Sequence, residues 1–113
     1  MADDIFRPLL ALADLGRGRM RSCRVGEREL VVCHTRDGVF AVDNICTHAL
    51  ARMSEGYLKG TRITCPLHGA TFDVRTGAVL GGPATMPLAA YQTRVVDGMI
   101  EVAVPAPPET ETK

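Results

Sequence analysis

The sequence predicts an all-β protein built as a small antiparallel sandwich or barrel. Short segments rich in β-branched and other apolar residues recur along the chain, and turn-forming residues separate them at short intervals. Several short strands with turns between them are typical of these two architectures. The chain has 113 residues, which is enough for one domain with a modest core.

The N-terminal half contains four expected strands, at 6–12, 19–25, 29–34 and 39–42. The first segment is apolar, the second alternates between arginines and other residues, and the third contains the run Leu30-Val31-Val32. Asp37-Gly38 stands before the fourth segment. It predicts a hairpin turn there, because both residue types tolerate a positive φ.

The C-terminal half contains four more expected strands, at 62–64, 71–74, 91–96 and 99–104. Arg75-Thr76-Gly77 predicts a turn, and Asp97-Gly98 predicts a hairpin between the last two strands. Residues 49–55 favour at most one short helical turn. We expect one domain over residues 1–104. Residues 105–113 are rich in Pro, Glu and Thr and are expected to be disordered.

Composition narrows the functional classes. The 13 basic residues balance the 13 acidic residues, whereas binding to nucleic-acid phosphates needs a basic surface. No segment of this sequence approaches the roughly 18 apolar residues of a membrane-spanning helix. The first residues include Asp3 and Asp4 and lack the basic and apolar pattern of a secretory signal. We therefore expect a soluble cytoplasmic protein without nucleic-acid or membrane partners.

Two short motifs indicate a metal centre. They are Cys46-Thr47-His48 and, after sixteen residues, Cys65-Pro66-Leu67-His68, and they use two of the four cysteines and two of the three histidines. Cys-x-His in an extended segment places both ligands on one face. Cys-x-x-His needs a turn, for which Pro66 and Gly69 are suited. Two thiolates and two imidazoles are the ligands of a [2Fe–2S] cluster whose irons take one pair each.

With these motifs the chain resembles the Rieske-type [2Fe–2S] proteins, and among them the soluble ferredoxins of bacterial aromatic-ring-hydroxylating oxygenases. The similarity continues through Gly69, residues 71–74, Thr76-Gly77 and Gly81-Gly82-Pro83, and covers roughly residues 5–104. It implies the Rieske fold, with a cluster-binding part of two loops at about 44–84. It also implies that the loop at 81–83 covers the cluster.

The resemblance further implies a ligand set and a role. We expect one [2Fe–2S] cluster, with Cys46 and Cys65 on one iron as thiolates and His48 and His68 on the other as neutral imidazoles. The protein is then an electron carrier and not an enzyme. Its implied partners are an NAD(P)H-dependent flavoprotein reductase, which donates one electron, and the terminal oxygenase of an aromatic dioxygenase system, which receives it.

Two positions after the second motif bear on the reduction potential. In high-potential Rieske proteins a Ser and a Tyr there donate hydrogen bonds to the cluster sulfurs, whereas this chain has Ala70 and Phe72. Neither side chain can donate. We therefore expect a potential in the lower part of the Rieske range, which runs from about −150 to +300 mV.

Other functions match parts of the pattern. The catalytic subunit of a Rieske oxygenase needs two more histidines and a carboxylate for its mononuclear iron, and only His34 remains. The small subunit of an assimilatory NAD(P)H nitrite reductase shares the fold, although members of that group often lack the ligands. A structural zinc module is an alternative of another class, but the similarity beyond the ligands opposes it.

The remaining cysteines and His34 have structural interpretations. Cys23 and Cys33 lie in strand segments without a ligand nearby, so we expect buried thiols rather than a disulfide. The extra disulfide of membrane-complex Rieske proteins would join positions near Ala51 and at Leu67, and neither is Cys. We expect His34 to be structural.

Surface residues give two further expectations. The arginines between positions 17 and 28 are expected to form one solvated strand face. Leu50, Leu67 and Pro83 are candidates for an apolar rim at the tip of the loops, by analogy with the docking surface of the family.

Overall fold

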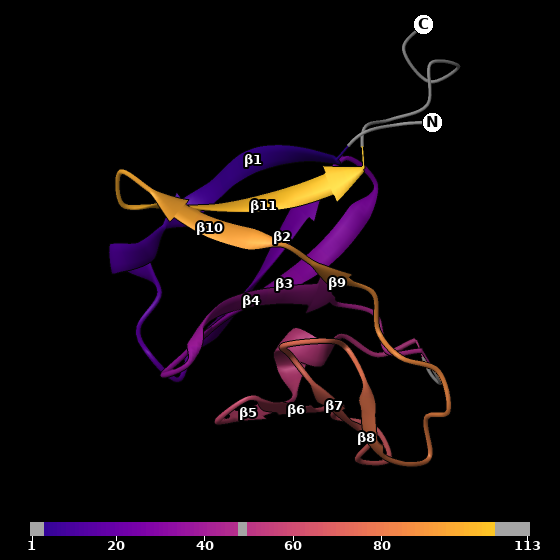
Figure 1. Cartoon of the computed structure of the whole chain (residues 1–113). Helices are drawn as coiled ribbons and strands as arrows, with labels where there is room; N and C mark the ends of the chain where they lie inside the picture. The colour runs from indigo at the N-terminus through magenta and orange to yellow at the C-terminus, as the bar shows by residue number, and fades with distance from the viewer. Residues whose placement is uncertain (1–3, 48–49, 106–113) are drawn as a thin grey trace, which may run out of the picture.

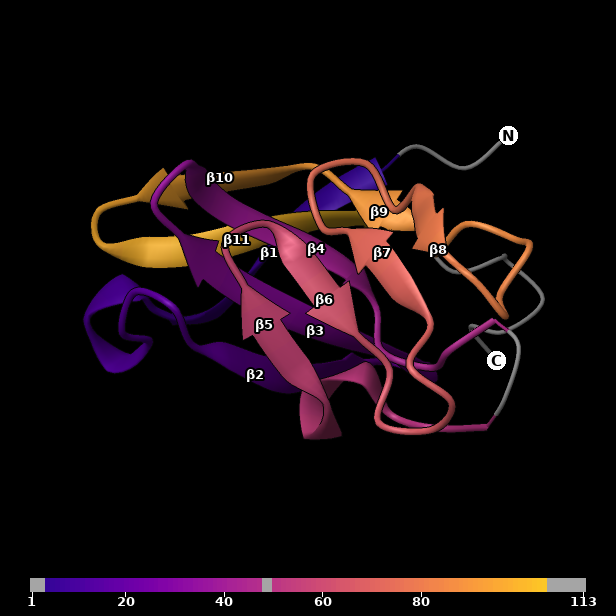
Figure 2. The ribbon, with the colours of Figure 1, turned by 90° about the horizontal axis from the view of Figure 1, so that it is seen from below.

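The computed structural model describes residues 4–47 and 50–105. Three antiparallel sheets form three layers (Figure 1, Figure 2), and the described residues contain no α-helix. The all-β prediction is therefore confirmed. Two short 3-10 helices, η1 (Leu12–Asp14) and η2 (Met53–Glu55), complete the described elements. The latter accounts for the helical turn expected at 49–55, of which residue 49 lies outside the described residues.

The first sheet has the order β1-β11-β10, and the second has the order β2-β3-β4-β9. Their bounds are β1 (Asp4–Ala11), β11 (Met99–Pro105) and β10 (Thr93–Val96), then β2 (Met20–Val25), β3 (Arg28–Thr35), β4 (Gly38–Asp43) and β9 (Ala90–Tyr91). The third sheet is a meander of β5 (Tyr57–Lys59), β6 (Arg62–Thr64), β7 (Thr71–Asp73) and β8 (Val79–Gly81).

The second sheet is the middle layer, and its strand β3 is buried on both faces. In β3, Leu30 and Val32 pack into a core shared with the first sheet, whereas Val31 and Cys33 pack into a core shared with the third sheet. Side chains alternate along a strand, so a strand covered on both sides needs apolar residues at consecutive positions. This explains the continuous run Leu30-Val31-Val32.

The third sheet and its loops form one excursion from the middle layer. The chain leaves the second sheet at the end of β4 and returns in β9, which pairs directly with β4 through Ala41↔Tyr91 and Val42↔Ala90. Residues 43–89 therefore begin and end at neighbouring points of one sheet. Both motifs lie within this excursion.

The predicted turn at Asp97-Gly98 is confirmed. Both residues have positive φ, 51° and 81°, and Val96 pairs with Met99 across a two-residue loop, as in a type I′ hairpin. The other predicted hairpin turns one residue earlier than expected. Gly38 pairs with Thr35 and is already the first residue of β4.

Other boundaries also differ from the predictions. The segment expected as one strand at 91–96 divides into β9 and β10, because the chain passes there from the second sheet to the first. The three-residue strands β5 and β8 were not predicted, since they are too short to show an alternating pattern. Pro105, expected in the tail, ends β11, and residues 106–113 lie outside the described residues.

Gly77 is required at the turn after β7. Its φ is +82°, and a Cβ added there would lie 2.0 Å from the carbonyl oxygen of Leu88. Its own carbonyl accepts the Leu88 N–H at 2.9 Å. The turn therefore holds the returning segment against the third sheet.

We predict that Gly77→Ala lowers the free energy of unfolding by about 2–4 kcal/mol, from left-handed strain plus the clash with Leu88. Gly60→Ala is the matched control, because Gly60 has a φ of +62° and open space around its Cβ position. It is expected to cost only about 1–2 kcal/mol. Denaturant unfolding measures both values, and equal losses in the two variants would contradict the predicted clash.

Candidate metal centre

The first motif lies in a loop closed by backbone contacts. Ile45 and Arg52 form an isolated antiparallel bridge. Inside it, the Cys46 N–H donates to the carbonyl oxygen of Ala51 at 2.9 Å. Cys46 is therefore fixed at the start of the loop. His48 lies outside the described residues.

The second motif lies in a loop of the same form. Thr64 of β6 pairs with Thr71 of β7, and the Cys65 N–H donates to the carbonyl oxygen of Ala70 at 2.7 Å. In both loops the cysteine N–H thus binds the carbonyl of the fifth residue along the chain. The two cysteines therefore occupy equivalent positions in two similar loops.

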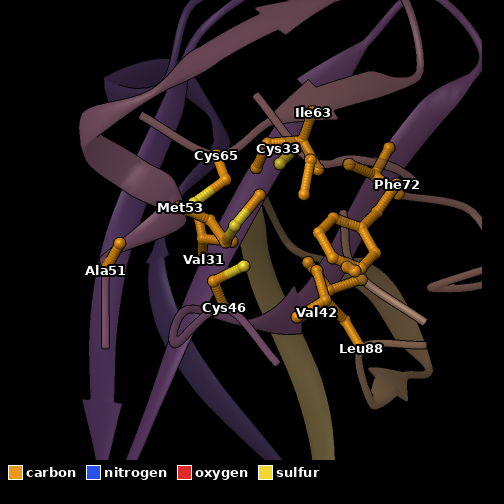
Figure 3. Close-up of a cluster of buried hydrophobic side chains, with 13 residues drawn as sticks. Val31, Cys33, Val42, Cys46, Ala51, Met53, Ile63, Cys65, Phe72 and Leu88 are labelled. Atoms are coloured by element: carbon orange, nitrogen blue, oxygen red, sulfur yellow. The ribbon is translucent and has the colours of Figure 1, made fainter. Parts of the chain in front are cut away.

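The structure brings the two cysteine side chains together in the interior. Cys46 is 4% exposed and Cys65 is 1% exposed, and both belong to the core between the second and third sheets (Figure 3). Burial raises the pKa of the Cys65 thiol, the backbone N–H of Leu67 lowers it, and the hydrogen-bonded thiol of Cys46 raises it again. Two thiols in direct contact are close enough to bind one metal ion as thiolates.

His68 lies on the outside of the second loop. It is exposed, and its φ of 67° is followed by a φ of 75° at Gly69. Histidine is among the residues that enter the left-handed region more readily than most, and glycine enters it without steric cost. The turn predicted for Pro66 and Gly69 is therefore present. It separates the buried thiol of Cys65 from the exposed imidazole of His68.

This arrangement fits the ligand set of a two-iron cluster. Within residues 4–47 and 50–105, no three His, Cys, Asp or Glu side chains gather as a site for one metal ion. A Rieske cluster divides its ligands, with two thiolates on one iron and two imidazoles on the other. The buried thiols of Cys46 and Cys65 and the exposed imidazole of His68 match this separation of sulfur from nitrogen ligands.

A third segment, 82–88, packs beside the two loops. Ala84 and Leu88 are buried in the same core as the two cysteines. The Thr47 hydroxyl donates to the carbonyl oxygen of Met86 at 2.7 Å, which ties this segment to the first loop. The sequence pointed to 81–83 but not to the Thr47–Met86 contact, because a hydroxyl between two ligand positions has no distinctive pattern.

Asn44 anchors the base of the first loop. Its side chain is fully buried, its N–H donates to the Glu29 carbonyl at 2.9 Å, and its own carbonyl accepts the Met53 N–H at 2.6 Å. Its side-chain oxygen accepts the Ser54 N–H at 2.8 Å. The Glu29 carboxylate also binds the Arg52 guanidinium at 3.1 Å. This network could not be predicted from the sequence, since Glu29 lies far from Asn44 along the chain.

The expected apolar residues at the tip are exposed. Leu50 is 96% exposed and Leu67 is 49% exposed, and Pro83 is exposed as well. Met86 was not predicted to belong to this surface. It is 63% exposed, and its contact with Thr47 places it next to the first loop.

The two positions after the second motif where this chain lacks a hydroxyl group lie in the interior. Ala70 and Phe72 are both 0% exposed. Ala70 also accepts the hydrogen bond from Cys65. Their side chains offer the site apolar contacts and no hydrogen bond.

Cys33 is a buried thiol, as predicted, whereas Cys23, also predicted to be buried, is only half-buried. His34 makes a structural contact, as predicted. Cys23 and Cys33 are free thiols that pack against different cores on opposite faces of the second sheet. Burial raises the pKa of Cys33 to about 12. His34 Nδ1 lies 2.7 Å from the Leu15 carbonyl oxygen and must donate the hydrogen, since a carbonyl can only accept.

A family model of the Rieske [2Fe-2S] domain matches residues 6–92. The chain belongs to the Rieske [2Fe–2S] domain family. The anthranilate 1,2-dioxygenase ferredoxin subunit of Burkholderia cepacia is 36% identical over 99 residues, which are 88% of this chain and 92% of that protein. The ferredoxin component of the naphthalene 1,2-dioxygenase system of Pseudomonas putida is 41% identical over 86 residues, which are 76% and 83% of the two chains.

Solved structures agree with this assignment. The ferredoxin of carbazole 1,9a-dioxygenase from Nocardioides aromaticivorans has a TM-score of 0.84 at 35% identity, covering 87% of this chain and 96% of that one. A chain of the complex of reduced oxygenase and oxidized ferredoxin in carbazole 1,9a-dioxygenase has a TM-score of 0.83 at 38% identity, covering 88% and 93%. The nitrite reductase small subunit from Mycobacterium tuberculosis, at 24% identity, shares the fold alone.

Within the Rieske family, this chain belongs with the ferredoxin components of aromatic dioxygenase systems. These are electron-transfer components rather than catalytic subunits, as expected from the sequence, and their cofactor is a Rieske-type [2Fe–2S] cluster. The part of the chain that the structure describes has no helix long and apolar enough to cross a membrane.

Tyr91 joins β9 to the start of the excursion. Its hydroxyl donates to Asp43 Oδ1 at 2.5 Å and accepts from the Arg28 guanidinium at 3.1 Å. Burial and the Asp43 carboxylate raise the pKa of Tyr91 to about 12. In the unfolded chain the tyrosine pKa is about 10. The Tyr91 phenol therefore keeps its proton more strongly in the folded state than in the unfolded state.

We predict that this contribution to stability is complete below about pH 10 and is lost as the pH rises from about 10 to 12. Tyrosinate absorbance should show a late step that Tyr91→Phe removes and Asp43→Asn moves to lower pH. Tyr57→Phe, which changes the other tyrosine of the chain, is the control and should retain the late step. If the late step persists in Tyr91→Phe, it does not come from Tyr91, and the predicted effect of Asp43 on this phenol is wrong.

Proposed function

We propose that this protein accepts one electron from an NAD(P)H-dependent flavoprotein reductase and passes it to the terminal oxygenase of an aromatic dioxygenase system. The ligands we assign are Cys46 and Cys65 on one iron and His48 and His68 on the other. The observation that carries the assignment is the meeting of two buried thiols from two similar loops. The relatives named as ferredoxin components support the electron-transfer role.

When bound, a cluster with this ligand set takes up and releases single electrons at a higher potential than an all-cysteine cluster. The residues of the chain prepare its surroundings. Cys46 and Cys65 lie in a core that excludes water, together with Met53, Ile63 and Phe72. The backbone N–H of Leu67 points to the Cys65 sulfur and stabilises its thiolate form.

The exposed side of the site is suited to electron exchange. His68 is exposed at the tip, so a partner can approach it without unfolding any part of the chain. Leu50, Leu67 and Met86 expose apolar surface on the three neighbouring segments. We assign the cluster-binding part to about 44–84, and we place the protein in the cytoplasm, where the free thiols of Cys23 and Cys33 would stay reduced.

We predict that His48→Ala, His68→Ala, Cys46→Ser and Cys65→Ser each abolish the parent visible and EPR spectra. His34→Ala is the matched control, because the His34 side chain contacts the Leu15 carbonyl, away from both motifs. It should retain both spectra. The parent and His34→Ala should also accept electrons from NADH through the reductases of the naphthalene or anthranilate system and should support their oxygenases.

Either histidine variant with the parent spectrum would contradict the ligand assignment. A protein loaded with the cluster that neither system reduces would contradict the proposed partners. A chain that binds one zinc ion and no iron would instead be the structural module considered above.

We predict that Ala70→Ser and Phe72→Tyr raise the reduction potential by some tens of mV each. A hydrogen bond to a charged group contributes about 1.5–3 kcal/mol. The potential shifts only by the part of this energy that differs between the oxidised and the reduced state. About 1.4 kcal/mol corresponds to 59 mV for one electron.

Ala41→Ser is the matched control for this effect. Ala41 is 1% exposed but packs in the core on the far face of the second sheet, so the potential should not move. Protein-film voltammetry measures all three variants. Unchanged or lower potentials in both Ala70→Ser and Phe72→Tyr would contradict the role of the missing hydroxyl groups.

A further inference from the structure

The outer face of the third sheet carries an unusual row of charges. Lys59 of β5 pairs with Arg62 of β6, and Arg62 pairs in turn with Asp73 of β7. Paired residues project to the same face. The opposite face holds Leu58, Ile63 and Phe72, which pack into the core. Lys59, Arg62 and Asp73 are therefore aligned on the face that points away from the rest of the protein.

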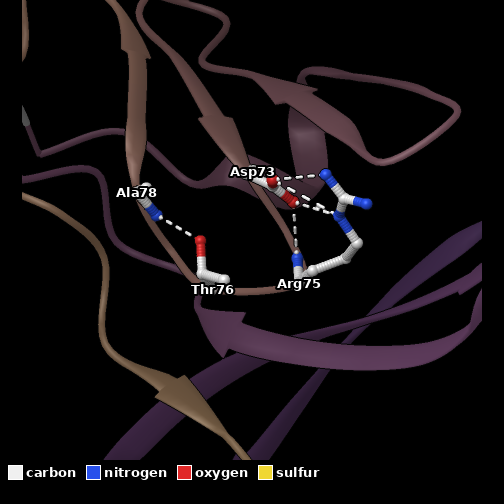
Figure 4. A network of polar contacts seen from close by, with 4 residues as sticks. All are labelled: Asp73, Arg75, Thr76 and Ala78. Atoms are coloured by element: carbon white, nitrogen blue, oxygen red, sulfur yellow. Dashed lines mark hydrogen bonds and ion pairs between the residues drawn. The ribbon is translucent and has the colours of Figure 1, made fainter.

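The single acid of this row is already engaged. Asp73 Oδ2 lies 2.9 Å from Arg75 Nη2, and Asp73 Oδ1 accepts from Arg75 Nε at 3.1 Å and from the Arg75 backbone N–H at 2.9 Å (Figure 4). This bidentate pair lowers the pKa of Asp73. Asp73 is thus paired with Arg75, which follows it in the same turn, and the three cations Lys59, Arg62 and Arg75 share this single acid.

Lys59 and Arg62 form a cross-strand pair of like charges. Both are exposed, and neither takes part in an ion pair within the described part of the chain. Like charges directly opposite each other on two strands are destabilising. The whole chain is neutral, so this local positive charge is not part of a generally basic surface.

The same face is hollowed. A shallow pocket is lined by Lys59, Thr61, Arg62, Asp73, Arg75 and Leu80. Leu80 is 50% exposed, and Tyr57 at the start of β5 is 72% exposed. Cationic groups around a concave surface with large apolar side chains are suited to carboxylates on another protein, because arginine binds them with several donors and the apolar neighbours lower the local dielectric constant.

The position of this face relates it to the electron-transfer site. Arg62 lies on β6, which leads directly into the loop of Cys65. Three residues of strand span about 10 Å. A protein interface of standard size buries about 800 Å² on each partner, which corresponds to a patch about 30 Å across. A partner seated on the tip beside His68 can therefore also contact Lys59 and Arg62.

We propose that the outer face of the third sheet, with Lys59 and Arg62 at its centre, is a docking surface for a carboxylate-rich surface of an electron-transfer partner. The inference rests on the function proposed above and adds the charge of the partner. The like-charge pair costs stability in the isolated protein. It is relieved when the partner places carboxylates between the two cations, which speeds association and orients the partner toward the tip.

The test separates docking from folding. Lys59→Glu replaces a repulsive cross-strand pair with an attractive one opposite Arg62, so this variant should unfold at the same or a higher denaturant concentration. The double variant Lys59→Glu/Arg62→Glu should raise the KM of the reductase or of the oxygenase for this protein roughly tenfold at low ionic strength. The difference from the parent should shrink as salt is added.

Arg17→Glu is the control, because Arg17 is an exposed arginine outside the third sheet. It should change each KM by less than about twofold, because it alters the net charge by two units without removing a contact. All variants should keep the parent visible spectrum and potential. A polyglutamate peptide should inhibit electron transfer by the parent and should not inhibit the double variant.

Equal KM values for the double variant and Arg17→Glu with both partners would overturn the docking surface. That result would leave the proposed function intact, since the parent would still transfer electrons. Failure of the cluster-loaded parent with both systems would overturn the proposed function instead.

Discussion

The structure depends on one repeated contact, the hydrogen bond from a cysteine N–H to the carbonyl of the fifth residue along. It closes the loop of Cys46 through Ala51 and the loop of Cys65 through Ala70. Each bond fixes its cysteine at the base of a loop, where the core between two sheets receives the thiol. The rest of each loop is then free to turn outward. A buried pair of thiols and an exposed imidazole at His68 follow from this geometry.

The middle sheet supports this site, because its two faces pack against two separate cores and the thiols lie in one of them. It is continuous with the site through Asn44, which links β3, the first loop and η2 by three hydrogen bonds. The third sheet is held from the other direction by Gly77, where any side chain would collide with Leu88. Both loops are thus carried by elements fixed to the same sheet.

The sequence predicted local features better than long-range contacts. The two motifs singled out Cys46 and Cys65, whose thiols the fold brings together in one core, and Asp97-Gly98 defines its turn by local conformation alone. The division of the segment at 91–96 could not be predicted, because sheet membership is a tertiary property. The contacts of Asn44 and the short strands β5 and β8 could not be predicted either. They depend on pairing with residues elsewhere in the chain, and no local sequence pattern reveals that pairing.

The central claim is that two thiolates and two imidazoles of this chain hold one two-iron cluster. EPR of the dithionite-reduced protein, with iron and acid-labile sulfide determined on the same sample, tests it most directly. The account predicts a rhombic spectrum with a low average g value, from a sample with about two irons and two sulfides per chain. A spectrum of the all-cysteine type, or a protein with zinc and no sulfide, would contradict it.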